Sequence, residues 1–135
     1  MKVLIDTNVI LDVLGNREPF VTDAVRVFKL CEVGKLSGCI SALSIPNIVY
    51  VMRKELDKDK IKDVLTKLTS IFTVVDLREI DLKKASDMDF GDYEDAVQSV
   101  CAARCKASFI ITRNVKDFRN SPVPAIKPSE LFDRV

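Results

Sequence analysis

The chain has 135 residues, the usual length of one domain, and 47% of them are hydrophobic, enough for a core on both faces of a sheet. Its 21 basic and 20 acidic residues leave a net charge of +1, so it lacks the strong positive charge typical of proteins that bind nucleic acid through overall charge. The absence of histidine excludes mixed Cys/His zinc sites, Ser-His-Asp triads and histidine acid–base catalysis. We expect residues 1–135 to form a single domain.

Short apolar runs alternate with amphipathic stretches in the first half of the chain. The run KVLI predicts a buried strand that ends at Asp6, and Gly34 stands where a helix stop belongs. The predicted elements are, in order, a strand at 2–5, a helix at 8–14, a helix from Pro19 to Gly34, a strand at 38–40 and a helix that Ser44 caps and that runs to Glu55.

The second half repeats the alternation. The predicted elements are a helix at 60–71, a strand at 72–75, a short helix at 81–86, a long helix at 92–105, a strand at 109–111 and an irregular tail with a last turn at 129–132. The strands are continuous apolar runs, and they alternate with helices throughout. This pattern predicts an α/β fold in which a parallel sheet is covered by helices on both faces.

No segment predicts export or a membrane span. Residues 1–6 hold one Lys and a short apolar run, too little for a signal peptide, and no later run approaches transmembrane length. We therefore expect a cytoplasmic protein, without a membrane partner, whose cysteines are reduced. Cys101 and Cys105 lie one helical turn apart; a metal site is an alternative, but we interpret both as buried apolar residues.

Polar residues follow three of the predicted strands: Asp6, Ser41 and Thr112. Ligands of open α/β sheets bind outside the carboxyl ends of the strands, so these residues indicate a site. A carboxylate such as Asp6, at the tip of an apolar strand, is costly to desolvate unless a positive or hydrogen-bonding group meets it. The alternative is that Asp6 merely caps the next helix.

A second acidic group begins the long helix at residues 92–105. Asp92 and Asp95 are spaced i, i+3 and therefore share a face of that helix, although acids in a first turn are also favoured by the helix dipole. Carboxylates that lie close together raise one another's pKa unless a cation neutralises them. With oxygen ligands only, the suitable cation is Mg²⁺ or Mn²⁺, which can polarise a phosphoryl oxygen and activate water.

Basic residues flank the predicted strand at 109–111, and only Asp117 opposes them. They fit the chemistry of a phosphate substrate, although an ordinary solvated face is the alternative for each one. These residues are Arg104, Lys106, Arg113, Lys116 and Arg119.

Four segments resemble the PIN domains, metal-dependent nucleases common among the toxins of bacterial toxin–antitoxin pairs. The resemblance covers almost the whole chain. The segments are VLIDTNVILD at 3–12, SALSIPNIVYVMRK at 41–54, DYEDA at 92–96 and FIITRNVKDF at 109–118.

The resemblance implies a three-layer α/β/α sandwich, a homodimer, RNA as substrate and a cognate antitoxin as partner. It also implies that Asp6 and Asp95 are metal ligands, and that Asp117, or a polar neighbour such as Asn114, completes the site with a catalytic role. The supporting residues that it implies are Asn8, Asn47, Asp92, Thr112 and Asn114.

One position departs from the family's pattern: Asn47 stands where many members carry a glutamate. An amide can coordinate a metal but adds no charge, so metal binding should be weaker; Glu94 is a candidate substitute.

The leading hypothesis is a Mg²⁺- or Mn²⁺-dependent endoribonuclease, and the alternative is a catalytically weakened module that binds RNA or protein. A haloacid-dehalogenase-type phosphatase is a third hypothesis, which Asn8 disfavours because such enzymes need an acid there.

Overall fold

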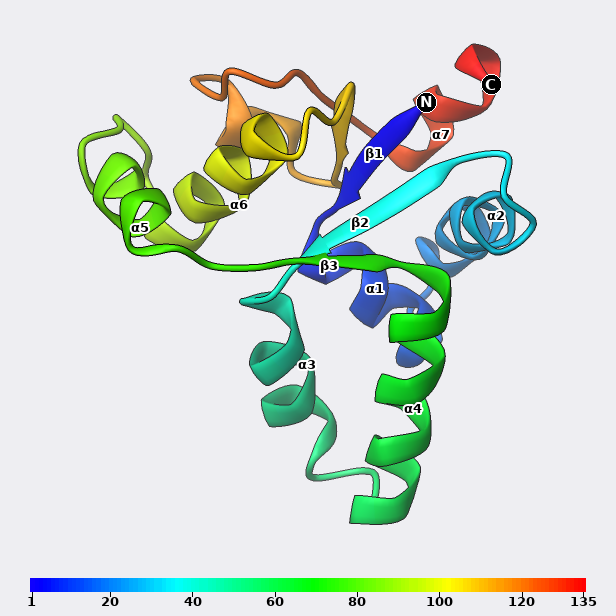
Figure 1. Cartoon of the computed structure of the whole chain (residues 1–135). Helices are drawn as coiled ribbons and strands as arrows, with labels where there is room; N and C mark the ends of the chain where they lie inside the picture. Colours follow the sequence, from blue (N-terminus) through cyan, green and yellow to red (C-terminus); the bar gives the residue numbers. More distant parts are fainter.

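Five parallel strands form one sheet in the computed structural model, which describes residues 1–135 (Figure 1). The strand order is β3-β2-β1-β4-β5, and every neighbouring pair is parallel, as the sequence predicts. The strands are β1 (Lys2–Ile5), β2 (Ser37–Ser41), β3 (Thr73–Val75), β4 (Phe109–Ile111) and β5 (Ala125–Ile126).

Helices cover both faces of this sheet. They are α1 (Thr7–Leu14), α2 (Val21–Glu32), α3 (Ser44–Met52), α4 (Lys58–Ile71), α5 (Glu79–Ser86), α6 (Tyr93–Arg104) and α7 (Pro128–Leu131), with 3₁₀ turns η1 (Val115–Phe118) and η2 (Phe132–Arg134). No helix is both long and apolar enough to span a membrane. The α/β/α sandwich expected from the sequence is therefore confirmed.

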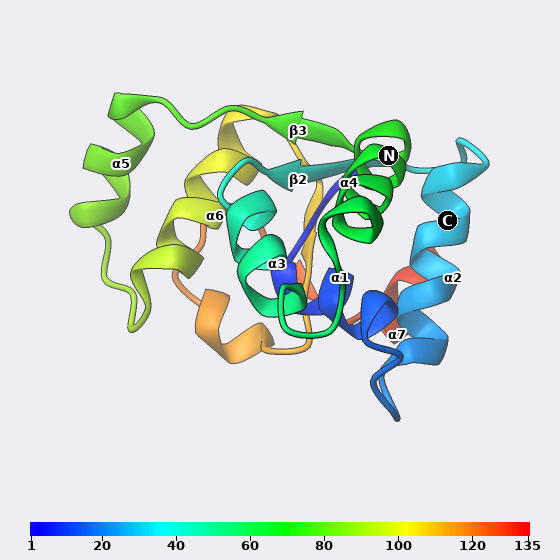
Figure 2. The same cartoon turned by 90° about the horizontal axis from the view of Figure 1, so that it is seen from below.

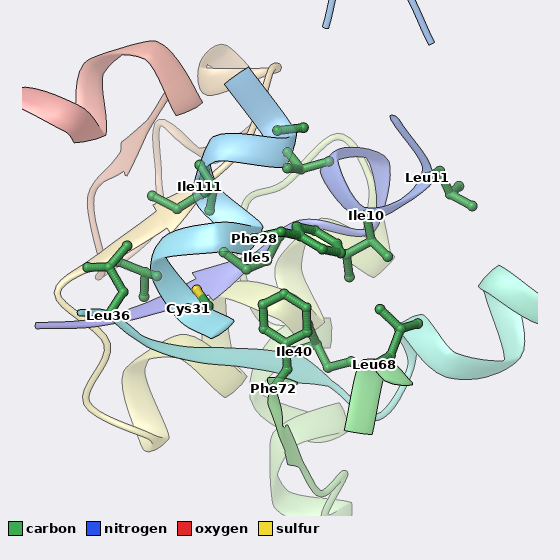
Figure 3. Packing of buried hydrophobic residues seen from close by; sticks show 14 of the residues in the cluster. Ile5, Ile10, Leu11, Phe28, Cys31, Leu36, Ile40, Leu68, Phe72 and Ile111 are labelled. Atoms are coloured by element: carbon green, nitrogen blue, oxygen red, sulfur yellow. The ribbon is translucent and has the colours of Figure 1, made fainter. Parts of the chain in front are cut away.

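Alternate residues of β1 feed two separate cores. Val3 and Ile5 point to the face covered by α1, α2, α3, α4 and α7, whereas Leu4 points to the face covered by α5 and α6. Side chains of the first core interlock in Figure 3, where Phe28 and Phe72 meet edge to face with ring centroids 4.9 Å apart. Because both faces of β1 are buried, the strand is apolar at every position after Lys2.

Gly38 of β2 permits the close packing of this first core. A Cβ atom at this position would lie 2.7 Å from Cys31 Sγ of α2 and 2.7 Å from the ring of Phe72, distances that no side chain tolerates. All four cysteines are free: Cys31 is buried in the first core, Cys39 and Cys101 are buried in the second, and Cys105 packs half-buried against the second. The interpretation of Cys101 and Cys105 as core residues thus holds fully for Cys101 and in part for Cys105.

Two local predictions were wrong. Ser44 does not cap a helix: it is the first residue of α3, is fully buried, and its hydroxyl lies 2.6 Å from that of Thr7 in α1. The tail predicted to be irregular contributes β5, a two-residue edge strand that pairs with β4.

The sheet order brings together the carboxyl ends of β1 and β4, which are adjacent strands. Figure 2 views the molecule from the side where β1 passes into α1, and α3, α6 and η1 lie around this end. Residues far apart in sequence therefore meet at one edge of the sheet.

Candidate active site

An acidic cleft of about 340 Å³ lies at the carboxyl end of β1. Every site residue expected from the sequence lines it except Thr112, which lies directly behind Asp6. The expected residues that line the cleft are Asp6, Asn8, Asn47, Asp92, Asp95, Asn114 and Asp117. Glu94 and Gln98 of α6 line it as well.

Asp6 is the deepest acid of the cleft, with only 3% of its surface exposed. It occupies the residue before α1, but its side chain makes no capping hydrogen bond, so the capping alternative is wrong. Instead Thr112 Oγ1 donates to Asp6 Oδ2 at 2.7 Å, and Gln98 Nε2 donates to Oδ1 at 2.9 Å. The Asn114 amide donates to Thr112 Oγ1 at 3.0 Å, which directs the threonine proton toward Asp6.

Asp95 lies in the first turn of α6 and lines the same cleft as Asp6. Burial, followed by the negative charges of Asp6, Asp92, Asp117 and Glu94, raises the pKa of Asp95 to about 7. This is the response of a carboxylate to burial and to nearby negative charges. Asp92 has a structural role too, because its Oδ1 accepts the Asp95 amide at 3.2 Å and caps α6.

Asn47 of α3 lies opposite Glu94 of α6 across the cleft. Its Nδ2 donates to Glu94 Oε2 at 3.4 Å, a long hydrogen bond that leaves the Asn47 carbonyl oxygen free. A carboxylate therefore lies next to the position where many PIN domains carry one, although it comes from a different helix. Glu94 thus points toward the site, as a substitute for the acid at position 47 must.

Gln98 is the site residue that sequence reasoning missed. It follows Asp95 by three residues on α6, and only 4% of its surface is exposed. The i, i+3 spacing from Asp95 was the only available signal, since a single amide inside an apolar helix carries no charge pattern.

Two of the basic residues assigned to phosphate chemistry serve the fold instead. Arg113 donates from Nε and Nη2 to the fully buried Asp12 at 2.7 and 3.1 Å. Arg104 is paired with Asp81 at 2.8 Å and with Asp76 at 3.0 Å. Their charges are already neutralised, so that part of the interpretation was wrong. Lys116 and Arg119 remain exposed beside Asp117.

The donor set of the cleft fits a hard cation. No three acidic or cysteine side chains lie close enough to hold an ion by themselves. Mg²⁺ does not require such a cluster, because it keeps several waters and usually takes one or two carboxylates. Carboxylate and amide oxygens, with the raised pKa of Asp95, suit an ion of this kind.

A second depression, of about 260 Å³, lies between α1, α2 and α4. Its lining is mostly apolar, and its three charged members, Lys29, Glu32 and Lys67, include a single acid. The acidic cleft is therefore the candidate site, because it unites perturbed titration with converging polar groups.

Comparisons with known proteins agree with this geometry. The sequence pattern of the PIN domain matches residues 2–116. The chain is 26% identical over 140 residues to Ribonuclease VapC1 of Aquifex aeolicus (strain VF5), an alignment that covers 98% of this chain and 94% of that protein. The structure of VapBC-1 from nontypeable Haemophilus influenzae has a TM-score of 0.70 at 19% identity and covers 96% of this chain and 99% of that one. A toxin–antitoxin complex from Klebsiella pneumoniae has a TM-score of 0.70 at 18% identity, with coverage of 93% and 97%.

Proposed function

Because this chain belongs to the PIN-domain family, we propose that it is a divalent-metal-dependent endoribonuclease that hydrolyses RNA phosphodiester bonds. The observation that carries the proposal is the meeting of Asp6, Asp95 and Asp117 in one cleft, with Asp6 held by two donors and free of any capping role. The relative named as a ribonuclease supports RNA as the substrate.

The acids of the cleft would hold Mg²⁺ or Mn²⁺, with Asp6 and Asp95 as ligands and Asp117 on the side of η1. When bound, such an ion polarises a phosphoryl oxygen and makes a coordinated water more acidic. Asp95 must lose its proton to act as a ligand. Burial and the neighbouring acids raise its pKa to about 7 and so oppose this loss, whereas a cation in the cleft would favour the ionised form. Asn8 and Asn114 offer amides that orient water or substrate at the same edge.

We also propose that the chain is the toxin of a two-gene pair, acts in the cytoplasm as a homodimer, and binds a cognate antitoxin. The fold shared with toxin–antitoxin complexes supports the partner. Residues 1–135 would then act as one domain. The phosphatase hypothesis is not retained, because the PIN pattern covers the segment in which Asn8 lacks the required acid.

The test is cleavage of structured and single-stranded RNAs by the pure protein in Mn²⁺, Mg²⁺ or EDTA. We expect cleavage that needs metal and falls by at least about 100-fold in an Asp6→Asn variant, because the variant loses a charged ligand. The variant is purified in parallel, so a contaminating ribonuclease would act equally in both samples. An Asp6→Asn variant as active as the parent would refute the proposal. RNA binding without cleavage, indifferent to EDTA, would favour the binding module that Asn47 suggests.

A further inference from the structure

Gln98 carries an unusual atom. Its Oε1 is the one buried side-chain oxygen or nitrogen in the chain without a hydrogen-bond partner. A buried acceptor left unpaired has lost its hydrogen bonds to water without replacement, so native proteins rarely keep one without a reason. The residue is 96% buried, by its 4% exposure, and it lines the acidic cleft.

Asp6 forces this orientation of the amide. The carboxylate is acceptor-only, so the group that faces its Oδ1 at 2.9 Å must be the Nε2 donor and not the carbonyl oxygen. Reversing the amide would place two acceptors against each other. Oε1 is therefore presented away from Asp6 as a fixed acceptor, at a site lined by residues that favour a hydrated cation.

None of the protein donors that line the cleft makes a hydrogen bond to Gln98 Oε1. Thr112 directs its hydroxyl proton to the other oxygen of Asp6, and Asn47 directs its amide to Glu94. Asn8 and Asn114 line the cleft as well, but neither donates to Oε1, and the acids there are acceptors when ionised. A water molecule is the natural donor, and waters bound to a cation are strong ones.

We propose that Gln98 is a positioning residue of the metal site: Nε2 fixes the orientation of Asp6, while Oε1 accepts a hydrogen bond from a water in the hydration shell of the bound ion. This inference rests on the proposed function, because it presumes that Asp6 holds a metal. It assigns Gln98 an indirect role, through Asp6 and water, and not direct coordination. It also gives a physical reason for the unpaired oxygen.

The test measures Mn²⁺ binding to the full chain by isothermal titration calorimetry, with cleavage left aside. Gln98→Met keeps the length of the side chain but removes donor and acceptor, and we expect its Kd to rise by about 10-fold or more. Ser99→Ala is the matched control, because Ser99 is the next buried polar residue but does not line the cleft, and its hydroxyl donates to Ala96 O and to Met88 Sδ instead. Its Kd should stay within about twofold of the parent value.

The outcomes separate this inference from the proposed function. If Asp6→Asn abolishes binding but Gln98→Met binds Mn²⁺ like the parent, the role of Gln98 is overturned and the metal site stands. A lower melting temperature of Gln98→Met in EDTA with an unchanged Kd would likewise overturn it, since Gln98 would then serve stability alone. If the parent binds no Mn²⁺, both proposals fall.

A crystal structure of the unmodified protein grown with Mn²⁺ tests the inference without any substitution. We expect Gln98 Oε1 within hydrogen-bond distance, about 2.5–3.2 Å, of a water bound to the ion. An Oε1 that coordinates the ion directly, or that contacts no such water, would overturn the assignment.

Discussion

Asp95 is a carboxyl group surrounded by four other acids on a half-buried helix start. Burial and the charges of Asp6, Asp92, Asp117 and Glu94 raise its pKa to about 7 from an ordinary 3.8. In the folded chain Asp95 therefore holds its proton over a pH range in which the unfolded chain has released it. Between about pH 4 and pH 7, the folded state binds more protons than the unfolded state.

This difference predicts how stability depends on pH. In EDTA, the melting temperature of the parent should fall as pH rises from about 4.5 to about 7, because Asp95 is forced to ionise beside other acids, and should then level off. An Asp95→Asn variant lacks the titration, so its profile should be flatter and the variant more stable at pH 8. Thermal unfolding followed by circular dichroism checks this. Parallel profiles for parent and variant would contradict the assignment.

Residue-scale features divide clearly into those that the sequence predicts and those that it does not. Asp6 and Asp95 were predictable, because each stands at a strand end or helix start whose position in a parallel sheet follows from topology. The ion pair between Arg113 and Asp12 was not predictable, because Asp12 lies 101 residues earlier and nothing local marks the pair. Gln98 escaped for the same reason: its partner Asp6 is 92 residues away.

At the scale of elements, α5 is attached to α6 by an ion pair as well as by apolar packing. Arg104 donates to both oxygens of Asp81, a residue with 1% of its surface exposed, and also to Asp76. Burial acts to raise the pKa of Asp81, but the hydrogen bonds and charges of Arg104 and Arg78 together outweigh burial and lower it. Asp81 also accepts the Arg78 amide at the start of α5, so one carboxylate joins the helix start to its neighbour.

Removal of Arg104 should therefore be costly. We expect Arg104→Leu to lower the free energy of unfolding by about 3 kcal/mol, because it leaves the buried Asp81 carboxylate without its cationic partner. Arg78→Ala, which removes an exposed pair with Asp76, should cost at most about 1 kcal/mol. Urea unfolding of both variants at pH 7 measures the difference. Equal losses would show that the Arg104 pair contributes no more than a surface pair.

How well a helix or strand could be predicted from the sequence depends on its length. The apolar runs of β1 and β4 were predicted with the observed bounds and the long periodic helices with small boundary errors, since their patterns extend over whole strands or whole turns. The strand β5 has two residues, flanked by Pro124 and Pro128, and prolines normally argue against a strand. Its pairing with β4 depends on the finished sheet, which no local pattern encodes.

For the whole molecule, the charge balance limits how RNA can be attracted. A net charge of +1 provides almost no long-range steering, and two arginines near β4 are neutralised by internal pairs. Few basic groups remain to meet phosphates, among them the exposed Lys116 and Arg119. Affinity must then depend on the bound cation and on short-range contacts.

The salt dependence of RNA binding should accordingly be shallow. A chain that meets about three phosphates of a single strand gives a slope of log K against log salt near −2, far below the slope of a strongly basic protein. Fluorescence anisotropy with the Asp95→Asn variant, which we expect to bind without cleaving, measures this slope. A slope of about −5 or steeper would indicate a basic RNA-binding surface that extends well beyond Lys116 and Arg119.

The place of β1 in the sheet determines when the cleft can form during synthesis of the chain. Asp6 is made early, yet Thr112, which holds it, lies 106 residues later, and β4 must pair with β1 before the cleft exists. A chain still growing on the ribosome therefore has no assembled site until translation has passed β4 and that segment has emerged. We therefore expect the proposed nuclease to be inactive during most of its own synthesis. A chain truncated before β4 should likewise be inactive.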